Sequence, residues 1–284
     1  MISGAPVHAL APGGRVLSGL DFGPPDGDPV LFIAGAATGK SMSFGGDLRR
    51  SANIRLLTMD RPGMGSSAVH SDRTLGSTVE DYLTFVEGVL GREDVRIPVV
   101  ANSQGSVFAL GAALAGWVSR LVLVSPADEL AHPAIHAMLP PEATRLADLV
   151  RTNPAEAARV LGTFTAETME SMVLEGADDI DRAHYTEPGF LSVYRRSLAE
   201  GFANEGAGYV RDTLIAMRPW ELPLGDLRLP VTILFGARDA GHSPDNGATL
   251  ARRIPAARRE VRNDAGGALL WSHSDVVLRS LRTS

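Results

Sequence analysis

The sequence predicts an α/β protein with a mostly parallel, doubly wound sheet and one helical insert. Through residue 126, short apolar runs alternate with helical patterns, as they do when crossover helices join parallel strands. Several of these runs are apolar throughout, which indicates strands buried on both faces. From residue 127 to 222 the alternation stops and helical patterns dominate, and a strand pattern then returns. The sequence therefore predicts a core in two parts, 1–126 and 223–284, with a helical lid at 127–222.

The strand and helix patterns of the core can be placed in chain order. A hairpin around 12–14 is expected first, with strands at 7–10 and 15–22. The expected buried strands follow at 30–34, 54–59, 97–101, 121–124 and 231–235, and a short strand is expected at 258–261. One core helix is expected to begin behind a Ser77–Glu80 capping box. The other expected core helices are 105–114, 249–253 and 271–281. This order predicts a parallel sheet with helices on both faces.

The helical patterns between residues 127 and 222 are expected to form a lid. They are predicted at 141–151, 154–164, 166–175, 189–200 and 208–217. A helical insert that follows one strand of a parallel sheet covers the carboxyl ends of the strands, where open α/β sheets bind ligands. The insert is therefore expected to help to form a ligand pocket.

Composition excludes several functional classes. The 284 residues carry a net charge of −6 without a basic cluster, so neither nucleic acid nor a membrane is an expected partner. Cysteine is absent, which removes disulfides, thiolate catalysis and cysteine-ligated metals. No apolar run approaches 18 residues, and Met1–Leu10 lacks the basic and apolar regions of a secretory signal. A cytoplasmic protein is expected.

One stretch joins a predicted strand to a predicted helix with a serine between them. The apolar run Ile97–Ala101 leads to Ser103, and a small-residue helix begins at Gly105. Small residues at 101, 105 and 106 permit a sharp turn. Such a turn lifts the Ser103 hydroxyl to the top of the sheet, beside the N–H of Gln104. The pattern predicts a nucleophilic serine. The alternative is an ordinary strand-to-helix turn whose serine caps the helix.

Five stretches, taken in order, resemble the α/β-hydrolase superfamily over essentially the whole chain. They are the strand before an oxyanion loop, a D-x-x-G-x-G-x-S loop, the serine elbow, an acid loop and a histidine loop: Val30–Gly35, Asp60–Ser67, Ser103, Gly236–Asp239 and Asp264–Gly266. The first departs slightly, because the usual His-Gly is Ala34-Gly35 here. The resemblance implies the α/β-hydrolase fold with a helical lid.

The resemblance also implies roles for particular residues. Ser103 would attack an acyl carbon, the Asp239 carboxylate would fix the tautomer of the base, and the N–H groups of Ala36 and Gln104 would hold the oxyanion. Asp239 could instead be a solvated loop acid or a helix cap, and Asp128 is an alternative acid. The expected substrate contacts are Gly35, Ala37, Phe164, Met172 and Trp220, and the lid also offers Leu139, Met169 and Met217 as candidate pocket walls. The alternative, which fits most of these lid residues better, is that they form the interior of the lid.

The chain departs from that family at the catalytic base. Members carry a histidine directly after the glycine of an Asp-x-Gly sequence, whereas Gly267 follows Asp264-Ala265-Gly266 here. Without a base, a serine hydroxyl is a weak nucleophile at neutral pH. Either another histidine supplies the base, or the chemistry is not serine acylation.

His242 is the first candidate for a replacement base. It lies three residues after Asp239, in a loop that reaches its proline five residues after that aspartate rather than the usual four. The extra residue and the conformational freedom of Gly241 would swing His242 toward Ser103. Three alternatives stay open: His242 is the base, His273 is the base, or no histidine is.

Two further motifs resemble a metal site and a phosphate-binding loop, but each is incomplete. His132 and His136 have the spacing of two metal ligands on a helix, but a third ligand is evident only if Asp128 joins them. Residues 34–41 nearly spell a phosphate-binding loop, but Ala34 stands where its first glycine is required. We therefore expect neither a metal nor another cofactor.

These observations predict a serine hydrolase that acts on a small, fairly apolar carboxylic ester, lactone or related acyl compound. A small-molecule substrate is the only partner expected, and the oligomeric state is left open. The alternative is a non-hydrolytic use of the same pocket, as a lyase, a cyclase or a small-molecule receptor, which the missing histidine keeps open.

Overall fold

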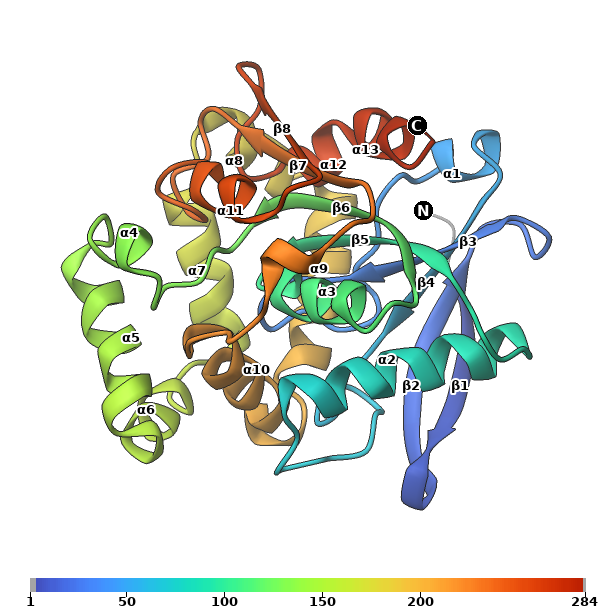
Figure 1. The fold of residues 1–284 in the computed structure, drawn as a ribbon, viewed down its shortest axis with the longest axis horizontal. Helices are drawn as coiled ribbons and strands as arrows, with labels where there is room; N and C mark the ends of the chain where they lie inside the picture. Colours follow the sequence, from blue (N-terminus) through green and yellow to red (C-terminus); the bar gives the residue numbers. More distant parts are fainter. Residues whose placement is uncertain (1–3, 283–284) are drawn as a thin grey trace.

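Eight strands form a single sheet in the order β1-β2-β4-β3-β5-β6-β7-β8 (Figure 1). The computed structural model describes residues 4–282, so the first three residues of the stretch tested for a secretory signal lie outside it. The strands are β1 (Ala5–Ala11), β2 (Arg15–Phe22), β3 (Asp28–Ile33), β4 (Ile54–Met59), β5 (Ile97–Ser103), β6 (Val118–Pro126), β7 (Val231–Gly236) and β8 (Ala257–Arg262). β1 and β2 form the predicted hairpin, β2 lies antiparallel to β4, and the remaining neighbours pair in parallel. The predicted mostly parallel sheet is confirmed.

The central strands bury both of their faces, as their continuous apolar runs predict. In β5, Val99 and Ala101 pack into one hydrophobic cluster, while Val100 packs into the cluster on the opposite face. β7 alternates in the same way at Ile233 and Leu234. Because successive side chains of a strand point to opposite faces, this alternation requires a helical layer on each side of the sheet.

Helices cover both faces of the sheet. One layer contains α2 (Leu75–Leu90), α3 (Gly105–Leu114) and α11 (Ala248–Arg253), and the other contains α1 (Leu48–Ser51), α12 (Leu269–Ser272) and α13 (Ser274–Ser280). The strand order reverses between β3 and β5, because the chain leaves β3 toward β4 and returns to pair β5 on the other side of β3. Open α/β sheets bind ligands at such a switch point, beyond the carboxyl ends of the strands.

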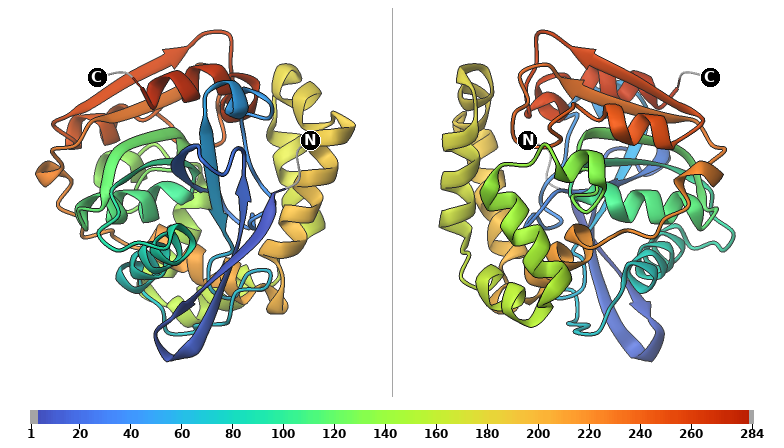
Figure 2. Two further views of the ribbon diagram at one scale, coloured as in Figure 1. Left: turned by 90° about the vertical axis from the view of Figure 1, so that its right-hand side faces the viewer. Right: turned by 60° about the vertical axis from the view of Figure 1, so that its left-hand side comes forward.

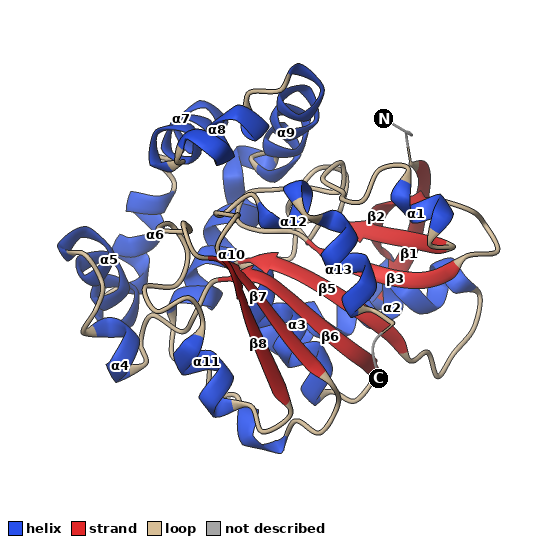
Figure 3. Cartoon of the chain, turned by 90° about the horizontal axis from the view of Figure 1, so that it is seen from above, coloured by secondary structure: helices blue, strands red, loops and turns tan. Residues whose placement is uncertain are grey.

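The helical insert between β6 and β7 lies at one end of the sheet (Figure 3). Its helices are α4 (Pro133–His136), α5 (Pro141–Thr152), α6 (Pro154–Leu161), α7 (Ala166–Gly176), α8 (Asp179–Tyr185), α9 (Pro188–Gly201) and α10 (Ala207–Met217). Figure 2 shows the yellow helices of this insert side by side along one flank of the core. None of the helices in the described part of the chain combines the length and the apolar character that crossing a bilayer requires.

Two local predictions are wrong, and the helix α8 was not predicted. The helix predicted behind Ser77 and Glu80 is capped by Thr74, whose hydroxyl accepts the N–H of Ser77 while the Ser77 hydroxyl accepts the N–H of Thr74. The last helix begins earlier than predicted and breaks at His273 into α12 and α13. The short helix α8 was not predicted, because its mixed polar and apolar residues show no clear helical period.

Candidate active site

Ser103 occupies a strained turn at the carboxyl end of β5. Its φ is +50°, in the left-handed region that residues with a side chain seldom adopt. Gly105, two residues later, opens α3 directly against the end of β3, where a Cβ would meet the carbonyl oxygens of Ile33 and Ala34 at 2.4 and 2.7 Å. Any side chain at position 105 would push the turn away from the sheet. The small residue that the sequence pattern required is therefore explained by close packing.

The loop after β3 comes close to the serine. A Cβ on Gly35 would lie 3.1 Å from the Ser103 Cβ, tighter than most real contacts. The next residue, Ala36, and the residue after the serine, Gln104, both have backbone N–H groups that donate to none of the described residues. Two free N–H groups beside a serine are the arrangement that an oxyanion hole requires.

The loop after β7 supplies a carboxylate and an imidazole that bind each other. His242 Nδ1 lies 2.9 Å from each carboxylate oxygen of Asp239. Oδ1 of Asp239 also accepts the N–H groups of Gly241 at 3.1 Å and of His242 at 3.3 Å. The Asp239 side chain is 1% exposed and that of His242 is 21% exposed, so the ring projects from a buried anion toward accessible space.

The loop after β8 lies against this pair and leaves room for it. The N–H of Arg238 donates to the carbonyl of Ala265 at 3.1 Å, which joins the two loops. A Cβ on Gly267 would lie 3.4 Å from His242 Cε1 and 3.5 Å from Asp239 Oδ1. The His242 imidazole therefore fills the space that a side chain at position 267 would enter.

The electrostatics of the pair follow from burial and mutual charge. Burial disfavours the charged imidazole, but the charge and hydrogen bond of Asp239, with the charge of Asp181, raise the pKa of His242 above its ordinary value. Burial also opposes ionisation of Asp239, yet the charge and hydrogen bond of His242 hold the pKa of Asp239 below its ordinary value. The carboxylate therefore stays ionised at neutral pH and favours a proton on Nδ1, which leaves Nε2 free to act as an acceptor.

Asp181 is a neighbour of this site that sequence reasoning missed. Its carboxylate reaches from α8 to accept the N–H groups of Gly267 at 2.6 Å and Ala268 at 3.1 Å. Burial raises the pKa of Asp181 above its ordinary value, against the lowering effect of these two bonds. One signal in the sequence could have located the helix that carries Asp181. Asp178 is a typical helix cap, and its side chain caps α8 by accepting the N–H of Asp181.

A cavity of about 220 Å³ joins the serine, the oxyanion loop and the imidazole. Four predicted site residues line it: Gly35, Ala36, Ser103 and His242. Its remaining walls are mostly apolar or aromatic and include Met42, Met169, Val173, Tyr185, Phe190, Tyr194 and Trp271. Among the described residues that line it there is no lysine or arginine. The cavity is therefore small, and its walls are largely apolar.

Four residues expected to contact substrate lie outside the lining of this cavity. Ala37 packs against α9, where a Cβ on Gly201 would lie 1.8 Å from the Ala37 carbonyl oxygen. The ring of Phe164 packs 6.1 Å from that of Tyr209, and the Trp220 indole N–H donates to the Ala216 carbonyl. Met172 is 54% exposed. In α7 the cavity is lined by Met169, a predicted wall residue, and by Val173, which was not predicted; both lie on the face of the helix next to that of Met172.

The other candidate bases and ligands have different partners. His273 Nε2 lies 3.5 Å from Asp264, and His136 Nε2 lies 3.3 Å from Asp148. Asp128, the alternative acid, lies 3.7 Å from Arg253, and burial raises the pKa of Asp128 to about 6. The described residues include no group of three or more side chains placed to hold a metal ion.

The near phosphate-binding loop is engaged in an ion pair. Lys40 Nζ lies 2.5 Å from Asp60, which also accepts the Lys40 N–H at 2.7 Å and the Ser66 N–H at 3.1 Å. The lysine therefore neutralises the buried aspartate of the D-x-x-G-x-G-x-S loop and is not presented to a phosphate.

Comparisons with known proteins agree with this architecture. A profile of the alpha/beta hydrolase family matches residues 30–279. Similar solved structures include a hydrolase from Pseudomonas aeruginosa PA01 (18% identity, TM-score 0.72, covering 99% of this chain and 98% of that one) and a thermophilic esterase from Thermogutta terrifontis (20%, 0.67, 98% and 97%). An enol-lactonase from Burkholderia xenovorans LB400 is also similar (19%, 0.68, 97% and 98%), whereas no curated protein matches the sequence. The chain belongs to the alpha/beta hydrolase family, which confirms the family and the hydrolase class predicted from the sequence.

Proposed function

We propose that the protein is a serine hydrolase that cleaves a small, fairly apolar carboxylic ester, lactone or related acyl compound. Ser103 is the nucleophile, His242 the base and Asp239 the carboxylate that orients it. The observation that carries the proposal is the His242 ring, which is paired with Asp239, fills the space beside Gly267 and shares a cavity with Ser103. A histidine from the loop after β7 thus takes the place of the missing one after β8.

The proposed steps follow from the polarity of these groups. Nδ1–H of His242 donates to Asp239, so Nε2 accepts the proton of Ser103 Oγ as that oxygen attacks the acyl carbon. The N–H groups of Ala36 and Gln104 bind the oxyanion of the tetrahedral intermediate. The imidazolium then returns its proton to the departing alkoxide, which leaves an acyl-enzyme. Water, deprotonated by His242, hydrolyses that ester and releases Ser103.

The cavity supports the substrate class. Its volume of about 220 Å³ is below the roughly 300–1,000 Å³ of pockets that hold drug-sized ligands, so short acyl groups suit it. Lysine and arginine are absent from the described residues that line the cavity, so no permanently charged cation faces a substrate carboxylate there, which favours neutral compounds. The esterases and the enol-lactonase among the similar structures fit this class, although at under 25% identity they indicate the fold alone.

The helical insert, residues 127–222, is proposed to act as the lid of the core formed by 1–126 and 223–284. Its helices α7, α8 and α9 provide Met169, Tyr185 and Phe190 to the cavity wall. The lid would exclude water and select the acyl group. The cytoplasmic location that the sequence suggests stays a prediction.

A fluorophosphonate probe tests the proposal, because it reacts covalently with an activated serine. The wild-type protein should be labelled and should hydrolyse p-nitrophenyl acetate and butyrate faster than p-nitrophenyl octanoate. Ser103→Ala should lose both labelling and turnover while its circular dichroism spectrum and Tm stay at wild-type values. Turnover that persists in Ser103→Ala would exclude the serine mechanism.

The alternative is a non-hydrolytic use of the pocket, and one observation favours it. No hydrogen bond joins Ser103 Oγ to His242 among the described residues. Catalytic hydrogen bonds often tighten only when substrate binds, so this spacing is compatible with hydrolysis. A wild-type protein that binds short esters yet resists the fluorophosphonate would support a lyase, a cyclase or a receptor.

A further inference from the structure

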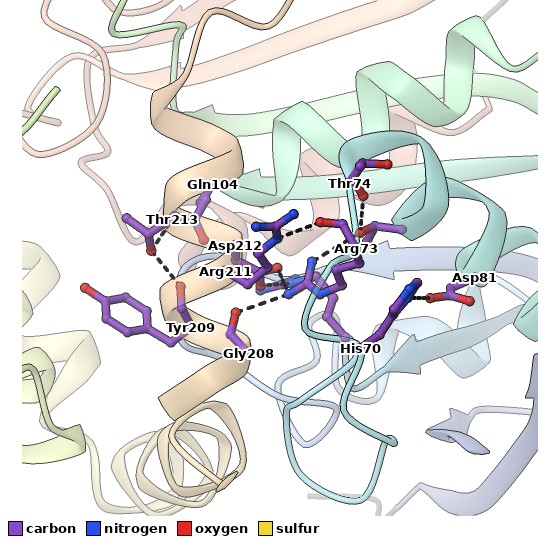
Figure 4. A network of polar contacts seen from close by, with 12 residues as sticks. His70, Arg73, Thr74, Asp81, Gln104, Gly208, Tyr209, Arg211, Asp212 and Thr213 are labelled. Atoms are coloured by element: carbon purple, nitrogen blue, oxygen red, sulfur yellow. Dashed lines mark hydrogen bonds and ion pairs between the residues drawn. The ribbon is translucent and has the colours of Figure 1, made fainter. Parts of the chain in front are cut away.

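Helix α10 of the insert sends two neighbouring polar side chains into the core. Asp212 and Thr213 are almost completely buried, and Figure 4 shows them beside Gln104 and Arg73. Buried polar groups cost free energy unless hydrogen bonds replace the water they lose. Hydrogen bonds connect these two residues to the segments that carry the two proposed oxyanion donors.

The first connection runs from Asp212 through Arg61 to the oxyanion loop. Nε of Arg61 donates to Asp212 Oδ2. The two remaining nitrogens of the guanidinium donate to backbone carbonyls, Nη1 to Ala34 at 3.0 Å and Nη2 to Gly35 at 2.9 Å. Arg61 is 1% exposed and Asp212 is fully buried, so water does not compete for these bonds.

The Gly35 carbonyl belongs to the same peptide unit as the Ala36 N–H. In a planar trans peptide the C=O and the following N–H point in opposite directions. A guanidinium that holds the Gly35 carbonyl on one side of the loop therefore aims the Ala36 N–H to the other side. That N–H donates to none of the described residues, and Ala36 lines the cavity that contains Ser103.

The second connection runs from Thr213 to Gln104. Nε2 of Gln104 donates to Thr213 Oγ1 at 3.2 Å, and the same hydroxyl donates to the Tyr209 carbonyl of its own helix at 2.9 Å. The hydroxyl is thus fixed as an acceptor for the glutamine. Gln104 begins the turn into α3, and its backbone N–H is the other proposed oxyanion donor.

We infer that α10 positions both donors of the oxyanion hole, with Asp212 acting through Arg61 on the Ala36 N–H and Thr213 acting on Gln104. Arg61, Thr213 and Asp212 are positioning residues: Arg61 binds the oxyanion loop, Thr213 binds Gln104, Asp212 acts through Arg61, and none of the three lines the cavity. The inference rests on the proposed function, since in that acyl-transfer mechanism the tetrahedral intermediate places an oxyanion between these N–H groups.

Arg73 provides a control that distinguishes a positioning role from a purely stabilising one. It is fully buried and pairs with the other oxygen of Asp212, as Arg61 does with the first. Its remaining bonds go to Thr78 Oγ1 and the Gly208 carbonyl, both at 3.1 Å, so they hold α10 against the start of α2. Arg61 and Arg73 therefore form a matched pair around one carboxylate, and only Arg61 reaches the oxyanion loop.

The test compares Arg61→Lys with Arg73→Lys on a short p-nitrophenyl ester. Lysine keeps the charge but lacks the fork that binds a carboxylate and two carbonyls at once. Arg61→Lys should lower kcat by about tenfold to hundredfold, less than or equal to the cost of removing one oxyanion donor, with KM unchanged. Arg73→Lys should lower Tm at least as much as Arg61→Lys does, but it should leave kcat near the wild-type value.

A boronic acid that forms a tetrahedral adduct with Ser103 supplies a second measurement. Its affinity should fall in Arg61→Lys by the same factor as kcat/KM, because both report on the oxyanion hole. Thr213→Val removes the hydroxyl without changing the shape of the side chain, and it should lower kcat by less than the roughly hundredfold cost of a lost donor. Thr213→Ser, which keeps the hydroxyl, should restore the rate. This milder pair decides the question if Arg61→Lys does not fold.

The outcomes separate the inference from the proposed function. Wild-type protein that neither turns over the ester nor accepts the fluorophosphonate overturns both. An active wild type with Arg61→Lys and Thr213→Val at full kcat and full boronate affinity overturns the inference alone. Equal losses of kcat in Arg61→Lys and Arg73→Lys also overturn it, because the network would then act only through stability.

Discussion

The loops after β7 and β8 lie side by side at the same end of the sheet, yet they contribute different things to the site. The loop after β7 carries both Asp239 and His242, and the two side chains bind each other. The loop after β8 contributes no side chain to the pair. Its Gly267 leaves space for the imidazole, and its N–H groups bind Asp181 from α8.

The difference indicates that the position of an imidazole and the sequence position of a histidine are separable. In the proposed mechanism the ring must lie between the serine and the carboxylate, whichever loop supplies it. Both loops approach that point, because the N–H of Ala237 donates to the Arg262 carbonyl at 2.8 Å and the N–H of Arg238 donates to the Ala265 carbonyl. A histidine on one loop therefore fits only when the other loop is small.

Removing His242 is expected to have the largest effect. In His242→Ala, kcat/KM for a short p-nitrophenyl ester should fall by roughly 10²- to 10⁴-fold, the usual worth of a positioned general base. His273→Ala is the matched control, because that ring lies at the start of the last helix beside Asp264 and outside the cavity lining. A His242→Ala enzyme as active as the wild type would show that the loop after β7 does not supply the base.

Moving the histidine to the other loop should give a smaller effect whose sign depends on the background. Gly267→His in the wild type should lower activity by roughly tenfold, because the His242 ring already fills the space that the new ring must enter. In the double variant His242→Ala/Gly267→His the space is free, and activity should exceed that of His242→Ala.

The control for this exchange is Gly267→Ala. Its Cβ would meet its nearest neighbours at ordinary contact distances of 3.4 Å or more, so activity should change little. A Gly267→His single variant that gains activity strongly would contradict the proposed role of His242, because it would mean that the wild type lacks a base.

The central strands and the serine turn follow from local features that the sequence displays. Apolar runs predicted the central strands because both of their faces are buried, and Gly105 predicted the sharp turn because a Cβ there would strike β3. The pairing of His242 with Asp239 could be predicted for the same reason, because the two residues are close in sequence. Contacts within one loop can be read from spacing.

The residues that could not be predicted act across long sequence distances. Asp181 lies 86 positions from Gly267, and Asp212 lies 151 positions from Arg61. Each is an aspartate in a helix whose partner is fixed only by how the insert packs on the core. Met172 was expected to line the pocket and Val173 was not, for the same reason: the helical period does not say which face of α7 meets the cavity.

The acid limb of the pH profile reports on the pairing of His242 with Asp239. Because His242 must be neutral to accept a proton and its pKa is raised, kcat/KM should rise with pH through a midpoint above the ordinary histidine value of about 6.5. The same shift stabilises the fold below that value, and this contribution is lost as pH rises through the pKa of folded His242. A midpoint below 6.5 in the free enzyme would contradict an imidazole paired with Asp239.

Asp181→Asn should give the smallest effect on activity, and it tests how far the loop after β8 depends on α8. The amide offers one acceptor where the carboxylate serves two N–H groups, so the free energy of unfolding should fall by about 1–3 kcal/mol. Loss of the negative charge should lower the pKa of His242, so the acid limb should move to lower pH while kcat on the plateau stays near wild type. Asp179→Asn, on the exposed side of the same helix, is the control and should leave both quantities unchanged. If the acid limb of Asp181→Asn stays in place although stability falls, then Asp181 supports the loop after β8 without acting on the imidazole, and the charge on α8 does not set the pKa of His242.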